Sequence, residues 1–248
     1  MWRILLGRLM LSVLMILVVA GVFAPAAWVA DAVGNDGILR LVHPSGTVWR
    51  GSAFVAIVDG ERATVFPGRM VWYVDVLSLF TGRLVLSLEH PAMDNPVRVT
   101  AVSDGLRVGP ATVRLPASVL TAFGTPFNTL RLAGDMQVAW TTLQFGRESA
   151  DGHAEMNWGS ASSALSPVVP LGRYRLTVDL RGRTGEAELR TLEGPLRLDG
   201  RGHMDGQVIR FSGVAGAEPD RRDSLGALLG VLGKRSGDKV LLEWELRR

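Results

Sequence analysis

Histidines and paired carboxylates are the residues of this chain whose types could support metal binding or acid–base catalysis. The four histidines are His43, His90, His153 and His203. None has the spacing of a zinc motif such as H-E-x-x-H, and each lies beside a turn signal, where a histidine is usually solvated. We therefore predict that the chain holds no metal.

Two groups of acidic residues, Glu186 with Glu188 and Asp199 with Asp205, could converge as a general acid–base pair. Two carboxylates on a β-surface are more often solvated than catalytic, and no G-x-S-x-G nucleophile motif accompanies them. The absence of cysteine excludes disulfides, thiolate metal ligands and cysteine nucleophiles. These patterns predict a protein that is not an enzyme.

Glycine-rich phosphate-binding loops are also missing. Residues 200–206 (GRGHMDG) lack the glycine spacing and the following helix of a dinucleotide loop, and no P-loop occurs. The stretch is typical of a β-hairpin. No cofactor and no small-molecule substrate are therefore expected.

Basic and acidic residues are interleaved along the whole chain. The net charge is only +3 although the pI is 9.9, and no block of five like charges occurs, so a phosphate-tracking stripe is not predicted. With 47% hydrophobic residues, the chain can build a sizeable core. We expect a folded body without a nucleic-acid partner.

An uncharged run near the N-terminus predicts a membrane anchor. Residues 9–30 comprise 22 residues without a charge, which at about 1.5 Å per residue can span the roughly 30 Å hydrocarbon core. Arg3 and Arg8 precede the run, whereas Asp31 and Asp36 follow it, so the positive-inside rule puts residues 1–8 in the cytoplasm. Residues 31–248 are then a periplasmic domain behind a single-pass inner-membrane anchor.

A cleaved signal peptide is the alternative, because Ala24-Pro25-Ala26 loosely fits a small-x-small cleavage site. The run is longer than the roughly 7 to 15 apolar residues of a signal peptide, and Pro25 weakens the site. We favour an uncleaved anchor, and both interpretations export the body.

Residues beyond Gly34 alternate between apolar and polar with a period of two, which is typical of half-buried strands. No long helical pattern separates the runs, so the pattern predicts a mostly β fold with a curved, largely antiparallel sheet. The clearest predicted strands are residues 48–58, 83–88, 97–102, 136–145, 174–180, 207–211 and 239–246, and the predicted turns are Ser45-Gly46, Asp59-Gly60, Asp104-Gly105, Asp151-Gly152, Asp205-Gly206 and Gly237-Asp238.

Two short helices are expected within this region. Residues 116–123 begin with Pro116 at the first helical position and end before Gly124. In residues 224–232, leucines recur at i, i+3, i+4 and i+7, with Asp223 or Ser224 as the cap and Gly233 as the stop. Either helix could plug an open end of the sheet, and simple core packing is favoured over a role as a helix that binds a partner.

A weak internal repeat appears when the chain is shifted by 90 residues. The shift aligns Gly82–Glu89 with Gly172–Asp179, and Leu106-Arg107-Val108 with Leu196-Arg197-Leu198. Chance is the alternative in a strand-rich chain. If real, the repeat predicts two similar meanders, at about residues 82–110 and 172–200, within one curved sheet.

Several glycine-punctuated pieces in a fixed order, behind the N-terminal hydrophobic segment, resemble the type II secretion system protein N family. The residues that carry the likeness are Gly46, Trp49 and Gly51 in Gly46–Ala53, residues 82–88, Pro116 in Leu115–Ser118, residues 130–134 with Trp140, Pro170 and Gly172 in Pro170–Tyr174, and Gly194, Pro195 and Gly200 in Gly194–Gly200. The likeness covers nearly the whole chain.

The resemblance implies a non-catalytic accessory subunit at the inner membrane that helps folded proteins leave the periplasm across the outer membrane. Its partners would be other subunits of the secretion system, with the inner-membrane platform and the secretin as candidates. The alternative is an AsmA-like periplasmic protein that handles lipids. An uncovered apolar groove along the sheet would favour that alternative, whereas a scaffold would cover the face with its own helices.

Overall fold

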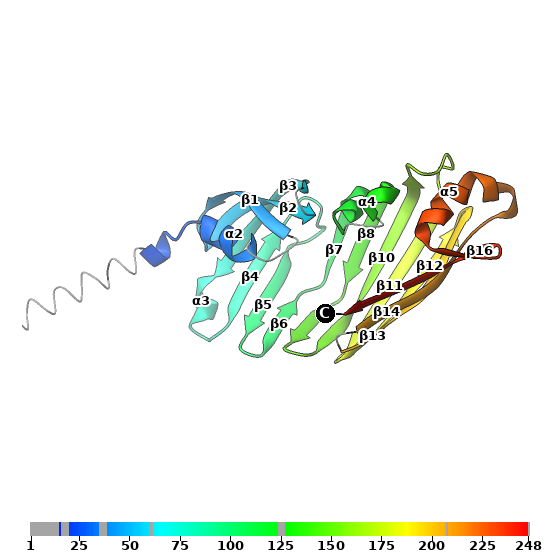
Figure 1. The fold of residues 1–248 in the computed structure, drawn as a ribbon. Helices are drawn as coiled ribbons and strands as arrows, with labels where there is room; N and C mark the ends of the chain where they lie inside the picture. Colours follow the sequence, from blue (N-terminus) through cyan, green and yellow to red (C-terminus); the bar gives the residue numbers. More distant parts are fainter. Residues whose placement is uncertain are drawn as a thin grey trace, which may run out of the picture.

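The computed structural model describes residue 15 and residues 20–34, 39–59, 62–123, 127–206 and 208–247. These residues form one open, antiparallel sheet that runs the length of the molecule (Figure 1). The strands are β1 (Leu39–Gly46), β2 (Arg50–Asp59), β3 (Arg62–Asp75), β4 (Leu84–Glu89), β5 (Val97–Val102), β6 (Gly105–Val108), β7 (Ala111–Pro116), β8 (Leu132–Trp140), β9 (Leu143–Gly146), β10 (Ala150–Ser163), β11 (Gly172–Arg181), β12 (Thr184–Glu193), β13 (Leu196–Asp205), β14 (Val208–Ala217), β15 (Lys234–Ser236) and β16 (Lys239–Arg247).

Neighbouring strands along the chain are mostly neighbours in the sheet, because short turns join antiparallel strands. The order is β1-β2-β3-β4-β5-β6-β9-β10-β11-β12-β13-β14-β16-β15, and β8 joins it beside β10 with β7 on its far side. The predicted mostly β, antiparallel fold is confirmed.

Short helices precede the sheet and connect some of its strands. They are α2 (Ala27–Gly34), α3 (Val76–Leu79), the 3₁₀ helix η1 (Ala117–Phe123), α4 (Phe127–Leu130), the 3₁₀ helix η2 (Pro219–Arg221) and α5 (Arg222–Leu232). The two predicted helices are found as η1 and α5, although Pro116 remains in β7, paired with Asp135. The expected cap at Asp223 or Ser224 is wrong, since α5 begins at Arg222 without a side-chain cap.

One predicted turn and one predicted strand differ from the structure. Asp151-Gly152 lies inside β10, where Gly152 has φ 144° and pairs with Leu180. The strand predicted at residues 136–145 is two strands, because Thr141 interrupts it by bonding to His153 at both its backbone N–H and its hydroxyl. At this break β10 changes neighbour from β9 to β8.

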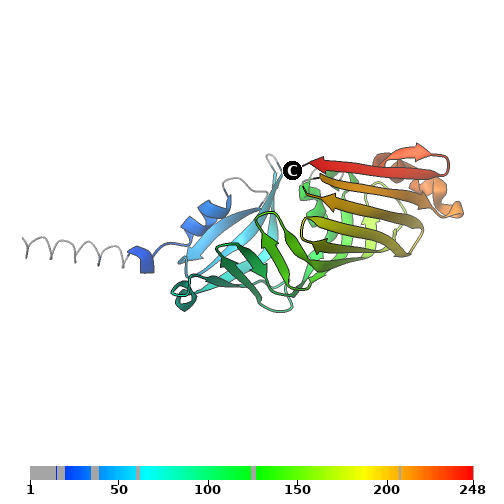
Figure 2. The ribbon, with the colours of Figure 1, turned by 90° about the horizontal axis from the view of Figure 1, so that it is seen from below.

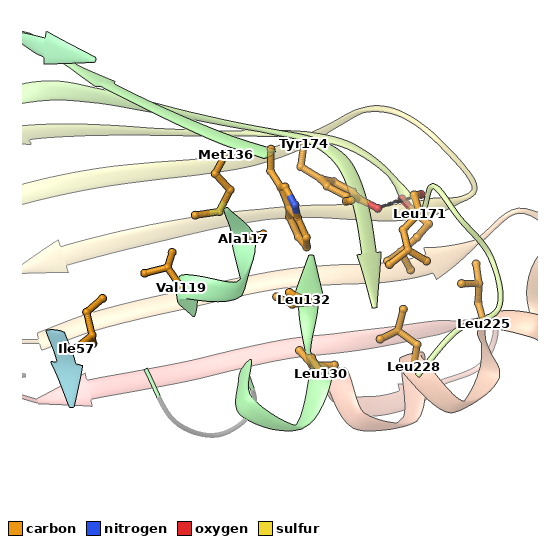
Figure 3. Packing of buried hydrophobic residues seen from close by; sticks show 13 residues of the cluster. Ile57, Ala117, Val119, Leu130, Leu132, Met136, Leu171, Tyr174, Leu225 and Leu228 are labelled. Carbon is orange, nitrogen blue, oxygen red and sulfur yellow. Dashed lines mark hydrogen bonds between the residues drawn. The ribbon is translucent and has the colours of Figure 1, made fainter. Parts of the chain in front are cut away.

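The sheet curls around a core built from distant parts of the chain (Figure 2). Figure 3 shows Tyr174 above Leu130 and Leu132, with Leu225 and Leu228 of α5 beside the same space. The members range from β2 to α5 and are Ile57, Ala117, Val119, Leu130, Leu132, Met136, Trp158, Ala161, Leu171, Tyr174, Leu196, Leu225 and Leu228. The helices therefore cover the inner face along one side of the strands.

Further along the strands the same inner face is apolar but only half-buried. The cross-strand row Val138–Met156–Leu176–Leu189 lies two residues beyond Met136, Trp158 and Tyr174. The next row contains Trp140 and Val178 and, across the sheet, ends at Phe211 and Trp244, whose rings stack at 5.3 Å. Trp244 is 41% exposed.

Residues 9–14 and 16–19 of the predicted membrane segment lie outside the described residues. Among the residues that the structure describes, no helix has the length and hydropathy needed to cross a bilayer. The end of the predicted segment belongs to the folded body: Ala24 and Ala26 are buried, and α2 starts at Ala27. Residues 82–110 and 172–200 each lie in an antiparallel meander, and their proposed repeat stays a prediction.

Candidate functional site

The first family-like piece, Gly46–Gly51, forms the tight turn between β1 and β2. Gly46 has φ 89°, and the Thr47 N–H donates to the Arg50 carbonyl at 2.9 Å. The Arg50 N–H in turn donates to Thr47 Oγ1 at 3.2 Å. Glycine is required at position 46 because a positive φ is strained for other residues.

This turn holds the chain where it enters the body. Trp49 Nε1 donates to the Gly21 carbonyl at 2.8 Å, the Val48 N–H donates to the Ala24 carbonyl at 2.9 Å, and the Ala26 N–H donates to the Gly46 carbonyl at 3.1 Å. We call residues 21–26 and 46–51 together the N-terminal clamp. It attaches the end of the hydrophobic N-terminal segment directly to the sheet.

Trp72, on β3, also binds to the clamp. Its indole N–H donates to the Val48 carbonyl at 3.0 Å, and its ring is 3% exposed. A Cβ on Gly51 would lie 2.7 Å from Trp72 Cε2, so glycine makes room for the ring. Trp72 thus covers Gly51, whereas Trp49 is half-buried and donates to the Gly21 carbonyl.

The pieces at residues 170–174 and 194–200 lie in contact with each other at another corner of the sheet. A Cβ on Gly194 would lie 2.6 Å from the Leu171 carbonyl oxygen, and one on Gly172 would lie 2.5 Å from the Glu193 carbonyl oxygen. The Leu196 N–H donates to the Leu171 carbonyl at 3.0 Å. Pro170 precedes this contact in a cis peptide, and Pro195 follows Gly194. The two backbones touch where only glycines fit.

Tyr174 lies at the centre of this corner (Figure 3). Its hydroxyl is 2.9 Å from the Leu196 carbonyl oxygen and 3.2 Å from that of Leu171. Burial raises the pKa of Tyr174, and the charge of Arg197 lowers it by less. The phenol is neutral and structural, because its oxygen faces carbonyls and not a substrate space.

Gly200 and Pro116 lie on two other strands of the sheet. Gly200, on β13, lies under Phe211, whose Cζ would be 2.5 Å from a Cβ at this position. Pro116 ends β7 just before η1. The family-like residues therefore form separate corners of the sheet and do not converge on one pocket.

The histidines do not form a cluster of metal ligands among the described residues either. His153 Nδ1 is 2.9 Å from Asp179 Oδ1 on the half-exposed sheet surface. His90 differs from the expected solvated state: its Nδ1 accepts from the Ala92 N–H at 3.0 Å, and its Nε2 is buried without a partner among the described residues. Within the described ranges no group of three or more potential metal ligands occurs.

The candidate carboxylates contact arginine and backbone. Glu188 Oε1 is 2.8 Å from Arg190 and 3.9 Å from Arg201, while Asp199 Oδ1 accepts from the Thr191 N–H at 3.1 Å. Glu186 lies opposite His203, and Asp205 opposite Thr184. The structure gives these four residues separate partners.

One feature of the surface was not predicted from the sequence. The connection from β3 to β4 presents Val76, Leu77, Leu79 and Phe80 to solvent, with Phe80 86% exposed. The signal was available as an apolar run at a turn, but its alternation does not distinguish an exposed loop from a buried strand end.

Comparison with known protein families gives a match over most of the sheet. The model of the family described as "Type II secretion system (T2SS), protein N" matches residues 38–241, from the residue before β1 into β16. Searches of curated proteins and of solved structures found no match.

Proposed function

Because this chain belongs to the type II secretion system protein N family, we propose that it is a non-catalytic accessory subunit of the type II secretion system. It is anchored in the inner membrane, with its sheet in the periplasm, and helps folded proteins to leave the periplasm across the outer membrane. The family match over residues 38–241 carries this proposal.

The N-terminal clamp supports the anchored arrangement. Since the clamp holds residues 21–26 on the body, the segment left to cross the bilayer is residues 4–20, in which Arg8 is the single charge. At about 1.5 Å per residue this segment reaches roughly 25 Å, at the short end of what spans a bilayer, and Arg8 can extend its guanidinium to the headgroups. The clamp would fix the body directly against this anchor.

The edges of the sheet offer unequal surfaces for a protein partner. The outer edge of β1 is interrupted by a bulge between Val42 and Ser45 and carries Pro44, features that hinder strand addition. β16 pairs with β14 through Arg247, whereas β15 covers its other edge only as far as Leu241. No described strand pairs with the rest of that edge, so we assign it to a partner strand.

Backbone orientation on β16 allows this assignment to be tested. The two-residue turn Gly237-Asp238 makes Ser236 and Lys239 a hydrogen-bonded pair, so residues 239, 241, 243 and 245 direct their N–H and C=O groups away from β14. Glu243→Pro removes one outward N–H and spares the bonds to β14. Glu243→Ala is the control, because it changes the side chain and keeps the N–H.

We expect Glu243→Pro to lose the secretion-system subunits that co-purify in detergent, while Glu243→Ala retains them. Circular dichroism should give the same melting temperature for both variants within a few degrees. Retention of every subunit by a folded Glu243→Pro protein would show that this edge is not the contact.

The overall proposal is tested by deleting residues 39–248 while keeping the N-terminal segment. We expect exoproteins to accumulate in the periplasm, measured by fractionation and immunoblotting, and full-length protein supplied from a plasmid should restore secretion. Normal secretion in the deletion strain would refute the proposal.

A lipid-handling role is the second candidate, favoured by the half-buried apolar rows on the inner face beyond the helices. Helices η1, α4 and α5 cover one side of that face, which suits a scaffold, and leave Met156, Leu176 and Leu189 partly accessible. Bound phospholipid in native mass spectra, together with an outer-membrane permeability defect and normal secretion, would favour this candidate.

A further inference from the structure

The connection between β3 and β4 has an apolar outer surface that solvent-exposed loops seldom show. Leu77 is 75% exposed and Phe80 86% exposed, and Val76 and Leu79 beside them are 43% and 39% exposed. We call residues 76–80 the apolar tip. It contains α3 and projects from the sheet in Figure 1.

Internal hydrogen bonds hold the tip in shape. Asp75 Oδ1 accepts from the Leu77 N–H at 3.1 Å and caps α3. Ser78 Oγ lies 2.6 Å from the Asp75 carbonyl oxygen and accepts from the Val85 N–H at 3.2 Å. The polar groups thus face inward and the apolar side chains outward, so the exposure of Leu77 and Phe80 is built into the loop.

The tip lies at the end of the molecule where the hydrophobic N-terminal segment enters. Both views place α3 at the same end as α2 (Figures 1 and 2). The Val74 N–H, two residues before α3, donates to the Trp49 carbonyl at 2.7 Å, and Trp49 in turn holds Gly21. Phe23, 71% exposed, and Trp28, 60% exposed, add apolar surface at this end.

A charged hollow of about 820 Å³ lies behind the tip. Its charged lining consists of three arginines and three aspartates: Arg83, Arg98, Arg107, Asp75, Asp104 and Asp151. The structure records no ion pair for these three arginines among the described residues. Guanidinium groups bind phosphate oxygens well, and a polar layer behind an apolar one matches the order of headgroups above acyl chains.

We infer that the apolar tip inserts into the periplasmic leaflet of the inner membrane beside the anchor, with the arginines of the hollow facing the phospholipid headgroups. This inference rests on the anchored arrangement of the proposed function. The clamp and the tip together give the sheet two attachments. They restrict rotation of the sheet about the anchor and set the direction in which β16 is presented.

The absence of cysteine makes site-specific labelling direct. The full chain carrying Phe80→Cys is labelled with an environment-sensitive fluorophore and reconstituted into nanodiscs of phosphatidylcholine and phosphatidylglycerol. Val231→Cys, at an exposed apolar position on α5 far from the N-terminal end, is the matched control. The measurements are the emission wavelength and quenching by lipids that carry a nitroxide in the acyl chain.

We expect emission from position 80 to shift to shorter wavelength and to be quenched by the lipid nitroxide, while position 231 stays aqueous. A label at position 80 that stays aqueous in discs that retain the protein overturns the inference and leaves the anchor intact. A chain that leaves the discs overturns both the inference and the anchored arrangement. Shielding of position 80 only after other secretion subunits are added would make the tip a protein contact and also overturn the inference.

Discussion

At the scale of single residues, the glycines of the family-like pieces let backbones and rings approach closely. Gly51 makes room for Trp72, Gly194 for the backbone of Leu171, and Gly200 for Phe211. Their chemistry is steric, because a hydrogen in place of a side chain permits contacts that a Cβ would prevent.

Replacement of Gly51 by alanine tests this steric role. The new Cβ would lie 2.7 Å from Trp72 Cε2 and 2.8 Å from the Thr47 carbonyl oxygen, so we expect the free energy of unfolding to fall by about 1–3 kcal/mol. Gly226→Ala is the control, since nothing lies within 4 Å of its Cβ and the helix α5 should gain about 0.5–1 kcal/mol. Urea denaturation measures both. Equal effects at the two positions would contradict the assignment.

Tyr174 should make the stability fall at alkaline pH. Because burial raises its pKa in the folded state, the unfolded chain loses the phenol proton first, from about pH 10 upward, which favours unfolding until the folded-state pKa is reached. The contribution is fully present below about pH 10. Tyr174→Phe should lower stability at neutral pH by about 1 kcal/mol and show a smaller loss between about pH 9 and pH 11. Parallel stability–pH curves would refute this.

At the scale of elements, the N-terminal clamp joins three segments that are distant in the sequence. Residues 21–26, the β1–β2 turn and β3 meet through Trp49 and Trp72. The ordinary sheet hydrogen bonds of β1 and β2 would form without residues 21–26. The clamp is thus an attachment added to a sheet that is already complete.

Trp49→Phe keeps an aromatic ring and removes the hydrogen bond to the Gly21 carbonyl. A hydrogen bond contributes about 1 kcal/mol, so we expect the Ala26 amide, which bonds to Gly46, to exchange its hydrogen about fivefold faster. The melting temperature should change little. Trp140→Phe is the control, because its indole N–H donates to Gly109 in another part of the sheet. Unchanged exchange at Ala26 would refute the clamp.

At the scale of the whole molecule, one core links the two ends of the described chain. It contains Ile57 from β2 and Leu225 and Leu228 from α5, with η1, β8, β10 and β11 between them. The described sheet has no second sheet packed on it, so the short helices and the curl of the strands together exclude water from one side of its inner face. We therefore expect the body to unfold in a single cooperative transition.

Leu225→Ala measures how much α5 contributes to this core. Leu225 is 0% exposed, and its truncation should lower the free energy of unfolding by about 2–5 kcal/mol while the transition stays single. Val231→Ala, on the exposed side of the same helix, should change it by less than about 1 kcal/mol. Scanning calorimetry distinguishes the cases. A separate low-temperature transition in Leu225→Ala would mean that α5 belongs to an independent unit.

The period of two, the turn glycines and the leucine spacing of residues 224–232 were sufficient to predict an antiparallel β protein, several of its strands and the helix α5. These signals are local, because each depends on which face of one strand or helix is buried. The observed strand bounds differ from the predicted ones by a few residues where pairing with neighbouring strands determines them. The strand predicted at residues 207–211 extends to Ala217, because β13 pairs with it along its whole length and β16 along most of it.

Tertiary structure alone decided which aromatic ring covers Gly51, where β10 exchanges β9 for β8, and why residues 21–26 belong to the body. Trp49 and Trp72 have similar sequence surroundings, and only the pairing of β2 with β3 brings one of them over the glycine. The exposed side chains of the apolar tip likewise have the composition of a core. Whether such residues are buried depends on what the rest of the chain places against them, and that is determined by contacts between segments far apart in the sequence.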